Sequence, residues 1–284
     1  MLTTEMPVLE VLDTHPKIKI SDVLKEVGLD AEHVAPRIVE RLELLNEVTK
    51  TVEDGENAVQ IAKSIFEYYV QNKPEKVFTE LEQKVVIIGS LFSDVGKTGP
   101  REATRDEQRL VVDMFAVENV QDPQMTVADF FQMYFPADAE VRIEKFEEME
   151  LNSEMSMRNF WNMHSQWTLE IISGDGIPAE AVAGAASHHI VDGVNPMNII
   201  GEDRRFTRYF GENAEFDRAE KLIIILDKYD AFWRRSGRTK EEAIELLRLI
   251  IGRNAMFAND EQFKELIDDL AQVVLSEAVK PVMG

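Results

Sequence analysis

The sequence predicts an all-α protein, and three observations lead to that prediction. Most segments place apolar residues three and four positions apart, the spacing that lines up one face of a helix. Short clusters rich in glycine, proline and polar residues separate these segments. The run with strand-like content, "KLIIILDKYDAF" at 221–232, has charged flanks and no partner strand, so we expect a core helix there.

The first fifty-five residues predict a helical hairpin with the rhythm of a helix-turn-helix. Apolar positions repeat over 21–29 and 35–48, with Gly28 at the intervening turn. DNA binding is the functional alternative for this segment. The second helix carries Glu40, Glu43 and Glu47, however, and a helix that enters a phosphate-lined groove normally has a basic surface.

Residues 56–284 predict a second, larger helical domain. Segments with helical apolar spacing are 58–71, 125–135, 179–191, 241–254 and 261–279. Helix-breaking clusters lie between such segments at 72–76, 96–100, 121–124, 135–139, 173–178, 192–196 and 234–239. A further breaking cluster, "DGEN", is expected at 54–57. The last helix is expected to pack on the core or to form the face of a homodimer. No internal repeat or low-complexity segment is present.

The bulk composition limits the classes of function. With 284 residues and 44% hydrophobic residues, the chain can bury a sizeable core. A net charge of −22 disfavours nucleic acid as a partner, since that binding depends on a basic surface. The apolar runs are too short to cross a bilayer, no signal-peptide pattern opens the chain and cysteine is absent, so we expect a cytoplasmic protein without a membrane partner.

The stretch "VVIIGSLFSDVGKTGP" at 85–100 is a candidate phosphate-binding loop, because an apolar run leads into Gly96-Lys97-Thr98. Such a loop needs four residues between its first glycine and the Gly-Lys pair. Six residues separate Gly89 from Gly96, and Leu91 stands where the first glycine should fall. The stretch is therefore no P-loop, and its chemical interest moves to Asp94, at the end of the apolar run.

Three of the five histidines, His164, His188 and His189, lie within 26 residues and predict a metal site. Adjacent histidines on a helix point about 100° apart, so both reach a common site only when it is wide or holds more than one ion. Hard divalent ions also favour oxygen ligands. Asp94 and Asp227 are the candidates, because each follows a strongly apolar run where the chain leaves the core.

The order of these pieces resembles the HD superfamily of metal-dependent phosphohydrolases, most closely its HD-GYP branch. "FSDVGK" is similar to the family's His-Asp-x-Gly-Lys segment, "ASHHIVDGVNP" to its His-His segment, and "ILDKYDAFWRRSGRT" to its Asp-x-x-Asp-Ala segment. The resemblance covers roughly 65–270 and implies an HD-domain helical bundle with an N-terminal helical extension. It also implies divalent metal ions, iron or manganese, that activate water for attack on a phosphodiester.

The resemblance implies a role for each matching residue. Asp94 would be a catalytic, bridging metal ligand, and His164, His188, His189 and Asp227 would be the other metal ligands. Lys97 would contact the phosphate during catalysis, and Arg235 and Arg238 would add substrate contacts. The implied partner is a small phosphorylated ligand or a cyclic (di)nucleotide.

Departures from the family pattern concentrate on one metal position. Ser93 replaces the first histidine of the His-Asp pair, and no upstream histidine is present, unless a carboxylate such as Glu67 takes its place. An acidic insertion spans about 98–155, and Val194 and Asn195 replace Gly-Tyr before Pro196. We therefore expect either a weak phosphohydrolase or phosphodiesterase for a small nucleotide, or a degenerate relative that acts as a metal- or nucleotide-binding sensor or scaffold.

Overall fold

The computed structural model describes residues 19–26, 28–29, 34–174, 176–206 and 216–276. These residues form twelve α-helices and no strand, which confirms the all-α prediction. The first eight are α1 (Ile20–Glu26), α2 (Pro36–Val48), α3 (Thr51–Asn72), α4 (Glu80–Phe92), α5 (Arg105–Ala116), α6 (Val127–Tyr134), α7 (Ala139–Glu148) and α8 (Met157–Ile172). The last four are α9 (Ala179–Ala186), α10 (Arg218–Asp230), α11 (Lys240–Arg253) and α12 (Glu261–Leu275). Short helical turns include η2 (Val95–Thr98), η3 (Ile190–Asp192) and the π-helical η6 (Ala231–Arg235).

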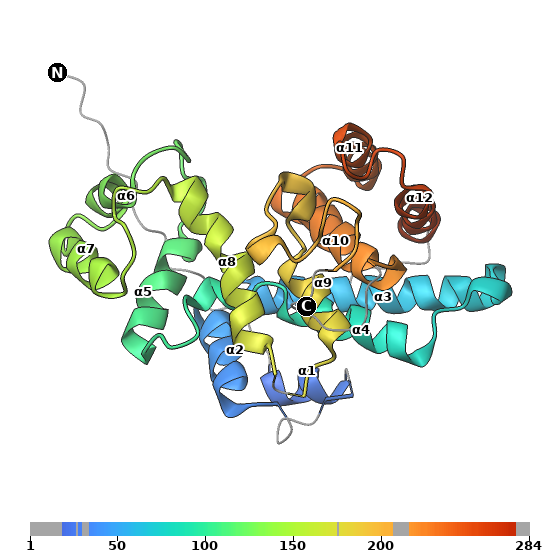
Figure 1. Ribbon diagram of the computed structural model, residues 1–284, viewed down its shortest axis with the longest axis horizontal. Helices are drawn as coiled ribbons and strands as arrows, with labels where there is room; N and C mark the ends of the chain where they lie inside the picture. The colour runs from blue at the N-terminus through green and yellow to red at the C-terminus, as the bar shows by residue number, and fades with distance from the viewer. Residues whose placement is uncertain (1–18, 27, 30–33, 175, 207–215, 277–284) are drawn as a thin grey trace.

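Helix α4 lies at the centre of the bundle and packs against α3, α9 and α10 (Figure 1). Two glycines allow this close packing: a Cβ added at Gly89 or at Gly184 would meet the Cδ1 atom of Ile223 at 2.2 or 2.4 Å. The α10 segment Leu222–Leu226 is fully buried, so "KLIIIL" is the core helix that the sequence predicts. Helix α12 turns its apolar face to α3, α10 and α11, and its role in a dimer stays a prediction.

Several helices begin at capping boxes, in which a side chain caps the third backbone N–H and a glutamate bonds back to the cap. These boxes pair Thr79 with Glu82 for α4 and Asp217 with Glu220 for α10. These boxes mark where the two helices start. Asp94 follows the C-terminal end of α4, and Asp227 lies in the last turn of α10.

The breaker predicted at 54–57 is wrong, because α3 continues from Thr51 to Asn72 without interruption. Gly55 serves packing instead of a turn: a Cβ at this position would lie 3.5 Å from both the Leu91 Cα and the Ser90 carbonyl oxygen of α4. The predicted domain boundary at 55/56 consequently falls inside one helix. The division into two domains stays a prediction.

The N-terminal hairpin contains α1 and α2, with Gly28 at a positive φ of 72° between them. Residues 27 and 30–33, which belong to the same predicted turn, lie outside the described part, as do His15 and His33. Arg41 of α2 is buried, and its guanidinium donates to the carbonyl oxygens of Thr98, Gly99, Pro100 and Arg101. This contact ties α2 to the chain that leaves η2.

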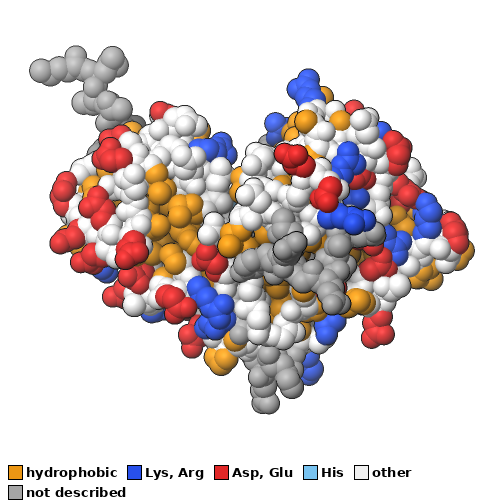
Figure 2. All heavy atoms as spheres, viewed as in Figure 1, with side chains coloured by type: hydrophobic (Ala, Val, Ile, Leu, Met, Phe, Trp, Pro, Cys, Tyr) orange, Lys and Arg blue, Asp and Glu red, His pale blue; other side chains and the backbone are white. Residues whose placement is uncertain are grey.

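The predicted insertion at about 98–155 contains α5, α6 and α7, which form a lobe at the end of α8 (Figure 1). Acidic side chains gather over α6 and α7 on the face shown in Figure 2. None of the helices in the described ranges combines the length and the apolar character that crossing a membrane requires.

Candidate metal centre

Four segments far apart in the sequence meet at the C-terminal end of α4. Asp94 stands between α4 and η2, and His164 projects from α8. His188 and His189 directly follow α9, and Asp227 lies in the last turn of α10. The fold thus brings together the five residues predicted as metal ligands.

Close backbone packing holds η2 against α8. The Gly96 N–H donates to the Thr168 hydroxyl at 3.0 Å, and that hydroxyl donates to the Ser93 carbonyl at 2.8 Å. A Cβ at Gly96 would lie only 1.9 Å from the His164 carbonyl oxygen, so no larger residue fits. Glycine at this position therefore sets the distance between Asp94 and His164.

Two imidazole nitrogens and one carboxylate oxygen converge at the centre. The Nε2 atoms of His164 and His188 are 2.9 Å apart, and the Asp94 Oδ1 atom lies 3.3 and 3.6 Å from them. The candidate ligand nitrogens of His164, His188 and His189 all lie within 4.8 Å of one another. We refer to these three histidines and Asp94 as the histidine centre.

The hydrogen bonds behind the two rings fix their tautomers. The Nδ1 atom of His164 faces the Trp161 carbonyl, and the Nδ1 atom of His188 faces the Ala185 carbonyl at 2.5 Å. Because a carbonyl only accepts, both Nδ1 atoms carry a proton, and an imidazole in this tautomer directs its Nε2 lone pair to the centre. Three electron-rich atoms therefore face one another, an arrangement that requires a cation or a shared proton.

Burial governs the charge of these groups. Burial lowers the pKa of His188 well below its usual value, and the neighbouring His189 adds to the effect, so the ring stays neutral. Burial would raise the pKa of Asp94, but the ammonium of Lys97 holds it well below its usual value. The Lys97 Nζ atom is 2.7 Å from Asp94 Oδ2, which leaves Oδ1 for the histidines. A carboxylate and two imidazoles form a donor set that suits Fe²⁺, Mn²⁺ or Zn²⁺.

His189 differs from the other two histidines. Its Nδ1 atom is 2.8 Å from Asp192 Oδ2 and 2.6 Å from the Lys228 Nζ atom. Nδ1 either donates to the Asp192 carboxylate or accepts from the Lys228 ammonium, so only Nε2 remains for a metal. His189 is also the most exposed of the three, with 26% of its side chain accessible.

Asp227 faces cationic side chains of the protein itself. Its carboxylate lies 3.1 Å from the Lys228 Nζ atom and 3.6 Å from the Arg235 Nη2 atom. Burial would raise the pKa of Asp227, but Lys228, with Arg235, lowers it. Lys228 stays charged despite its burial, because Asp227 and Asp192 raise its pKa.

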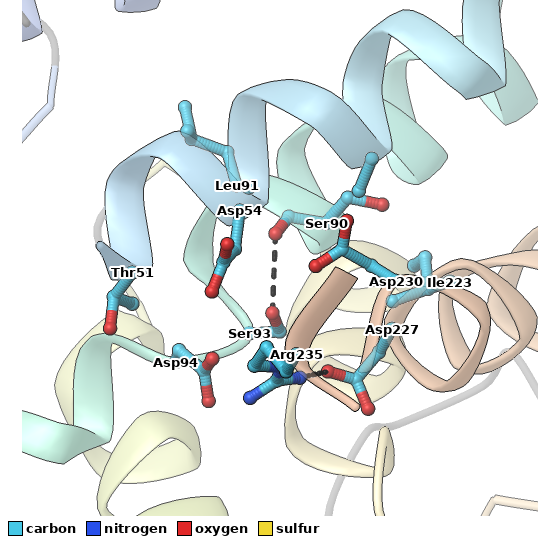
Figure 3. A pocket seen from close by; sticks show the side chains of 12 residues that line it. Thr51, Asp54, Ser90, Leu91, Ser93, Asp94, Ile223, Asp227, Asp230 and Arg235 are labelled. Carbon is cyan, nitrogen blue, oxygen red and sulfur yellow. Dashed lines mark hydrogen bonds and ion pairs between the residues drawn. The ribbon is translucent and has the colours of Figure 1, made fainter. Parts of the chain in front are cut away.

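A small cavity of about 20 Å³ lies beside the histidine centre, between α3, α4 and α10 (Figure 3). We call it the carboxylate cavity, because the aspartates that line it are Asp54, Asp94, Asp227 and Asp230. Burial raises the pKa of Asp54, and burial together with Asp54 raises the pKa of Asp230 to about 7. Ser93 also lines the cavity, and its hydroxyl donates to the Ser90 carbonyl at 3.2 Å.

Two predicted residues lie apart from the site. Arg238 is exposed in the segment between η6 and α11. Glu67, suggested as a substitute ligand, is exposed on α3, more than three turns after Asp54. The substitution suggested for Glu67 is therefore wrong, and the carboxylate of α3 that reaches the site is Asp54.

Sequence reasoning missed Asp54, Asp230 and Lys228 as members of the site. Asp54 belongs to "DGEN", which predicts a turn, and only the continuous helix α3 turns it towards α4. Asp230 and Lys228 occur in the quoted "DKYDA" segment, so their proximity to Asp227 was the available signal. Lys228 neutralises Asp227 and Asp230 lines the cavity because of the way α10 packs, which no local sequence pattern encodes.

Comparisons of this chain with protein-family models, with curated proteins and with solved structures find no match.

Proposed function

We propose that this protein is a metal-dependent phosphohydrolase that acts on a small phosphoester, such as a nucleotide or a phosphodiester. The observation that supports this most is the convergence of His164 Nε2, His188 Nε2 and Asp94 Oδ1, with both Nδ1 protons committed to backbone carbonyls. Hydrogen bonds of that kind typically orient metal-bound histidines. The donor set fits one ion of the iron or manganese class.

The side chains around the histidine centre have distinct roles in this proposal. A divalent ion held there would supply Lewis acidity, which activates water and polarises a phosphoryl oxygen. Lys97, already 2.7 Å from Asp94, would bind and neutralise a phosphoryl oxygen. Arg235 is 44% exposed and offers a second donor from the solvent side.

The proposal draws on the HD-superfamily resemblance of the sequence as well as on the geometry. That resemblance gives roles to six residues, and all six lie close together in this fold: Asp94, Lys97, His164, His188, His189 and Asp227. Cytoplasmic localisation and a cyclic dinucleotide as one substrate class belong to the same proposal.

A degenerate, non-catalytic sensor or scaffold is the second candidate, and a specific observation favours it. Asp227 is neutralised by Lys228 and Arg235, and Ser93 binds the Ser90 carbonyl instead of offering an imidazole. A chain with a single ion lacks the second cation that would stabilise attacking and leaving oxygens together. Metal binding without turnover would support this candidate.

Metal analysis combined with phosphodiesterase assays tests the proposal. We expect about one ion per chain after loading with Mn²⁺ or Fe²⁺, and hydrolysis of small phosphodiesters. The variant His188→Ala should lower metal affinity by about 100-fold or more, since even outer partners of metal ligands contribute 10- to 100-fold.

Lys97→Met is the complementary variant. It should retain the metal and lower turnover by about 100-fold, the effect expected for loss of a donor to the reacting oxygens. Less than half an ion per chain in the wild-type protein would exclude the hydrolase, whereas full loading without activity on any phosphoester would leave the sensor.

A further inference from the structure

The lobe of α5, α6 and α7, together with the first half of α8, is built from two matching halves. Residues 122–135 and 152–165 each form a turn that is followed by a helix with a hydroxyl cap. The two halves meet at an antiparallel bridge between the capping residues, Thr126 and Ser156. Only three of the fourteen aligned positions are identical, which is why the sequence alone shows no internal repeat.

Aromatic rings join the two halves into one core. The ring centroids of Phe131 in α6 and Phe146 in α7 are 6.1 Å apart, and those of Phe115 in α5 and Phe160 in α8 are 5.3 Å apart. Phe131, Phe146 and Phe160 are fully buried. The outer sides of α6 and α7 are therefore held in fixed positions, and a preformed surface loses less entropy when it binds a partner.

The outward sides of α6 and α7 form one continuous surface, over which acidic side chains gather (Figure 2). The Gln132 Nε2 atom of α6 donates to the Glu140 Oε1 atom of α7 at 2.6 Å and joins the two sides. Helical geometry places the neighbouring exposed residues on the same sides. The resulting α6–α7 face consists of Asp129, Gln132, Met133, Glu140, Val141, Glu144 and Glu148.

The α6–α7 face carries negative charge that its own helix does not balance. Glu140, Glu144 and Glu148 follow one another at a spacing of four residues, at which like charges on a helix repel. Glu148 also lies at the C-terminal end of α7, where the helix dipole favours a cation. Within the described ranges, none of the three forms an ion pair with lysine or arginine.

Basic residues of the lobe are directed away from this face. Residues 105–156 contain thirteen acidic and only four basic residues. Arg142 pairs with Asp113 at 3.3 Å and with Asp138 at 2.9 Å, and Lys145 lies 3.9 Å from Asp106. A cation brought by a partner would therefore meet the carboxylates of the α6–α7 face without a competitor from the lobe.

Two large apolar side chains project from the same face. Met133 is 51% exposed and Val141 is 58% exposed. Of the seven methionines in the described ranges that are at least partly exposed, five lie between α5 and the end of α8. Methionine side chains are flexible and polarisable, so they adapt to apolar partners of different shapes. The face thus combines apolar contacts with an excess of carboxylates.

We propose that the α6–α7 face is a docking surface for a basic amphipathic helix of a partner protein. Lysine or arginine side chains of that helix pair with Glu140, Glu144 and Glu148, and its apolar side covers Met133 and Val141. The charge disfavours nucleic acid and anionic membranes, which bind basic surfaces. It also disfavours a second copy of this chain, whose net charge is −22.

Fluorescence anisotropy of a labelled peptide tests the docking surface. The probe has about 20 residues, with lysine and leucine on opposite faces of a helix, and the control peptide has the same composition in an order that does not separate them. In about 0.1 M salt, the full-length chain should bind the amphipathic peptide at least about tenfold more tightly than the control peptide. Circular dichroism should show that the amphipathic peptide is helical when bound.

The variant Glu144→Gln/Glu148→Gln removes two neighbouring carboxylates from the face. Because exposed ion pairs are individually weak, we expect the affinity for the amphipathic peptide to fall about fivefold, and less at high salt. The control Glu241→Gln/Glu245→Gln removes the same charge at the same spacing from exposed positions of α11. It should change the affinity by less than about twofold.

The variant Val141→Ser tests the apolar contact. Covering a valine side chain corresponds to about tenfold in affinity, and added salt should not reduce this loss. Val70→Ser is the matched control, because Val70 is 59% exposed on α3, outside the α6–α7 face. It should leave the affinity within about twofold of the wild type. All four variants change exposed side chains, so we expect them to fold.

The histidine variant separates this inference from the proposed function. His188→Ala should bind the amphipathic peptide as the wild type does, since the α6–α7 face contains none of the residues of the histidine centre. Loss of peptide binding in His188→Ala would place the peptide at the histidine centre and overturn the inference.

Three further outcomes would contradict the docking surface. Equal binding of the two peptides, or an equal loss in the α6–α7 and α11 glutamine variants, would mean that the probe responds only to the overall charge of the chain. An unchanged affinity in Val141→Ser would exclude the apolar contact. The absence of binding up to about 1 mM protein would exclude a basic helix as the occupant.

Discussion

On one side of Asp94, two imidazole nitrogens meet a carboxylate oxygen with no cationic side chain between them. On the other side, Asp227 faces Lys228 and Arg235, and Asp54 and Asp230 share Arg234. At the histidine centre, Lys97 contacts the Asp94 oxygen that faces away from the imidazoles, and Lys228 contacts His189 Nδ1. In the carboxylate cavity, lysine and arginine side chains pair directly with the aspartates. A buried carboxylate is stable only when it is paired. Asp94 is paired by Lys97 on one oxygen and faces imidazoles on the other, whereas Asp54, Asp227 and Asp230 are paired by lysine or arginine alone.

This difference teaches where an external ion is required. Two imidazole Nε2 atoms and a carboxylate oxygen that face one another repel unless a cation or a shared proton lies between them, so we expect the geometry of the histidine centre to depend on such a bridge. In the carboxylate cavity, lysine and arginine already supply much of the attraction, so its geometry should persist without an added ion. The following predictions test each side.

The largest effect should follow from Gly96→Ala, which acts on the histidine side. The added Cβ would meet the His164 carbonyl at 1.9 Å and the Thr168 nitrogen at 2.6 Å, both backbone atoms that cannot rotate away. We expect the free energy of unfolding to fall by more than about 3 kcal/mol, measured by urea denaturation.

Gly252→Ala is the control for this change. Gly252 lies in α11, and an added Cβ meets nothing within 4 Å, so alanine should stabilise the protein by up to about 1 kcal/mol. If Gly96→Ala stays within 1 kcal/mol of the wild type, the close contact of η2 with α8 does not hold the centre together.

A somewhat smaller effect should follow from Lys228→Met on the carboxylate side. The Lys228 side chain is 6% exposed and pairs with Asp227 and Asp192, so its loss leaves the buried Asp227 carboxylate with only the longer contact to Arg235 at 3.6 Å. We expect a destabilisation of about 3 kcal/mol, of which Mn²⁺ restores a part by replacing the missing charge.

The control for Lys228→Met is Lys221→Met, on the same helix. Lys221 is 8% exposed and pairs with Asp260 at 3.0 Å, away from the site. This variant should lose a comparable free energy of unfolding without any recovery in Mn²⁺. Equal recovery in both variants would mean that the ion acts elsewhere on the protein.

The smallest effect concerns Glu220, a carboxylate of α10 that is buried without a cation. Burial raises its pKa to about 7, in contrast to Asp227. The folded state then holds a proton that the unfolded chain releases near its ordinary value of about 4.5. Stability should therefore fall as the pH rises from about 4.5 to 7, by about 2–3 kcal/mol. Glu220→Gln should remove this decline, as thermal unfolding across that range would show.

Glu82→Gln is a matched control, since Glu82 occupies the equivalent capping-box position of α4. Burial opposes the charge of Glu82, but its hydrogen bonds from Arg218 and Thr79 lower the pKa. Its contribution is thus present above about 4.5 and is lost as the pH falls through the lowered pKa. The two glutamine variants should differ in the sign of their pH dependence, and parallel profiles would contradict the assignment.

The sequence predicts the helical class and the main chemical residues because both depend on local patterns. Apolar spacing locates α10, and the position of Asp94 and Asp227 after apolar runs places both at the rim of the core. His164, His188 and His189 lie within 26 residues of one another in the sequence, and this clustering is the local signal for the group that the fold assembles.

The remainder depends on long-range packing that local patterns do not contain. "DGEN" has a turn composition, yet the contact of Gly55 with α4 keeps it helical and aims Asp54 at the cavity. Arg235 and Arg238 are equivalent as sequence positions after Asp227, but η6 directs only Arg235 to that carboxylate. Likewise, nothing in the local sequence indicates that Lys228 would also reach Asp192.

The guanidinium of Arg41 has a practical consequence for dissecting this chain. A fragment that starts at residue 56 would delete the donor on which the carbonyl groups from Thr98 to Arg101 rely, together with the first turn of α3 that carries Asp54. Residues 96–101 would then be free to rearrange, and Lys97 with them. The role of the N-terminal hairpin is therefore better tested in the full-length chain, by substituting Arg41 alone, than by truncation.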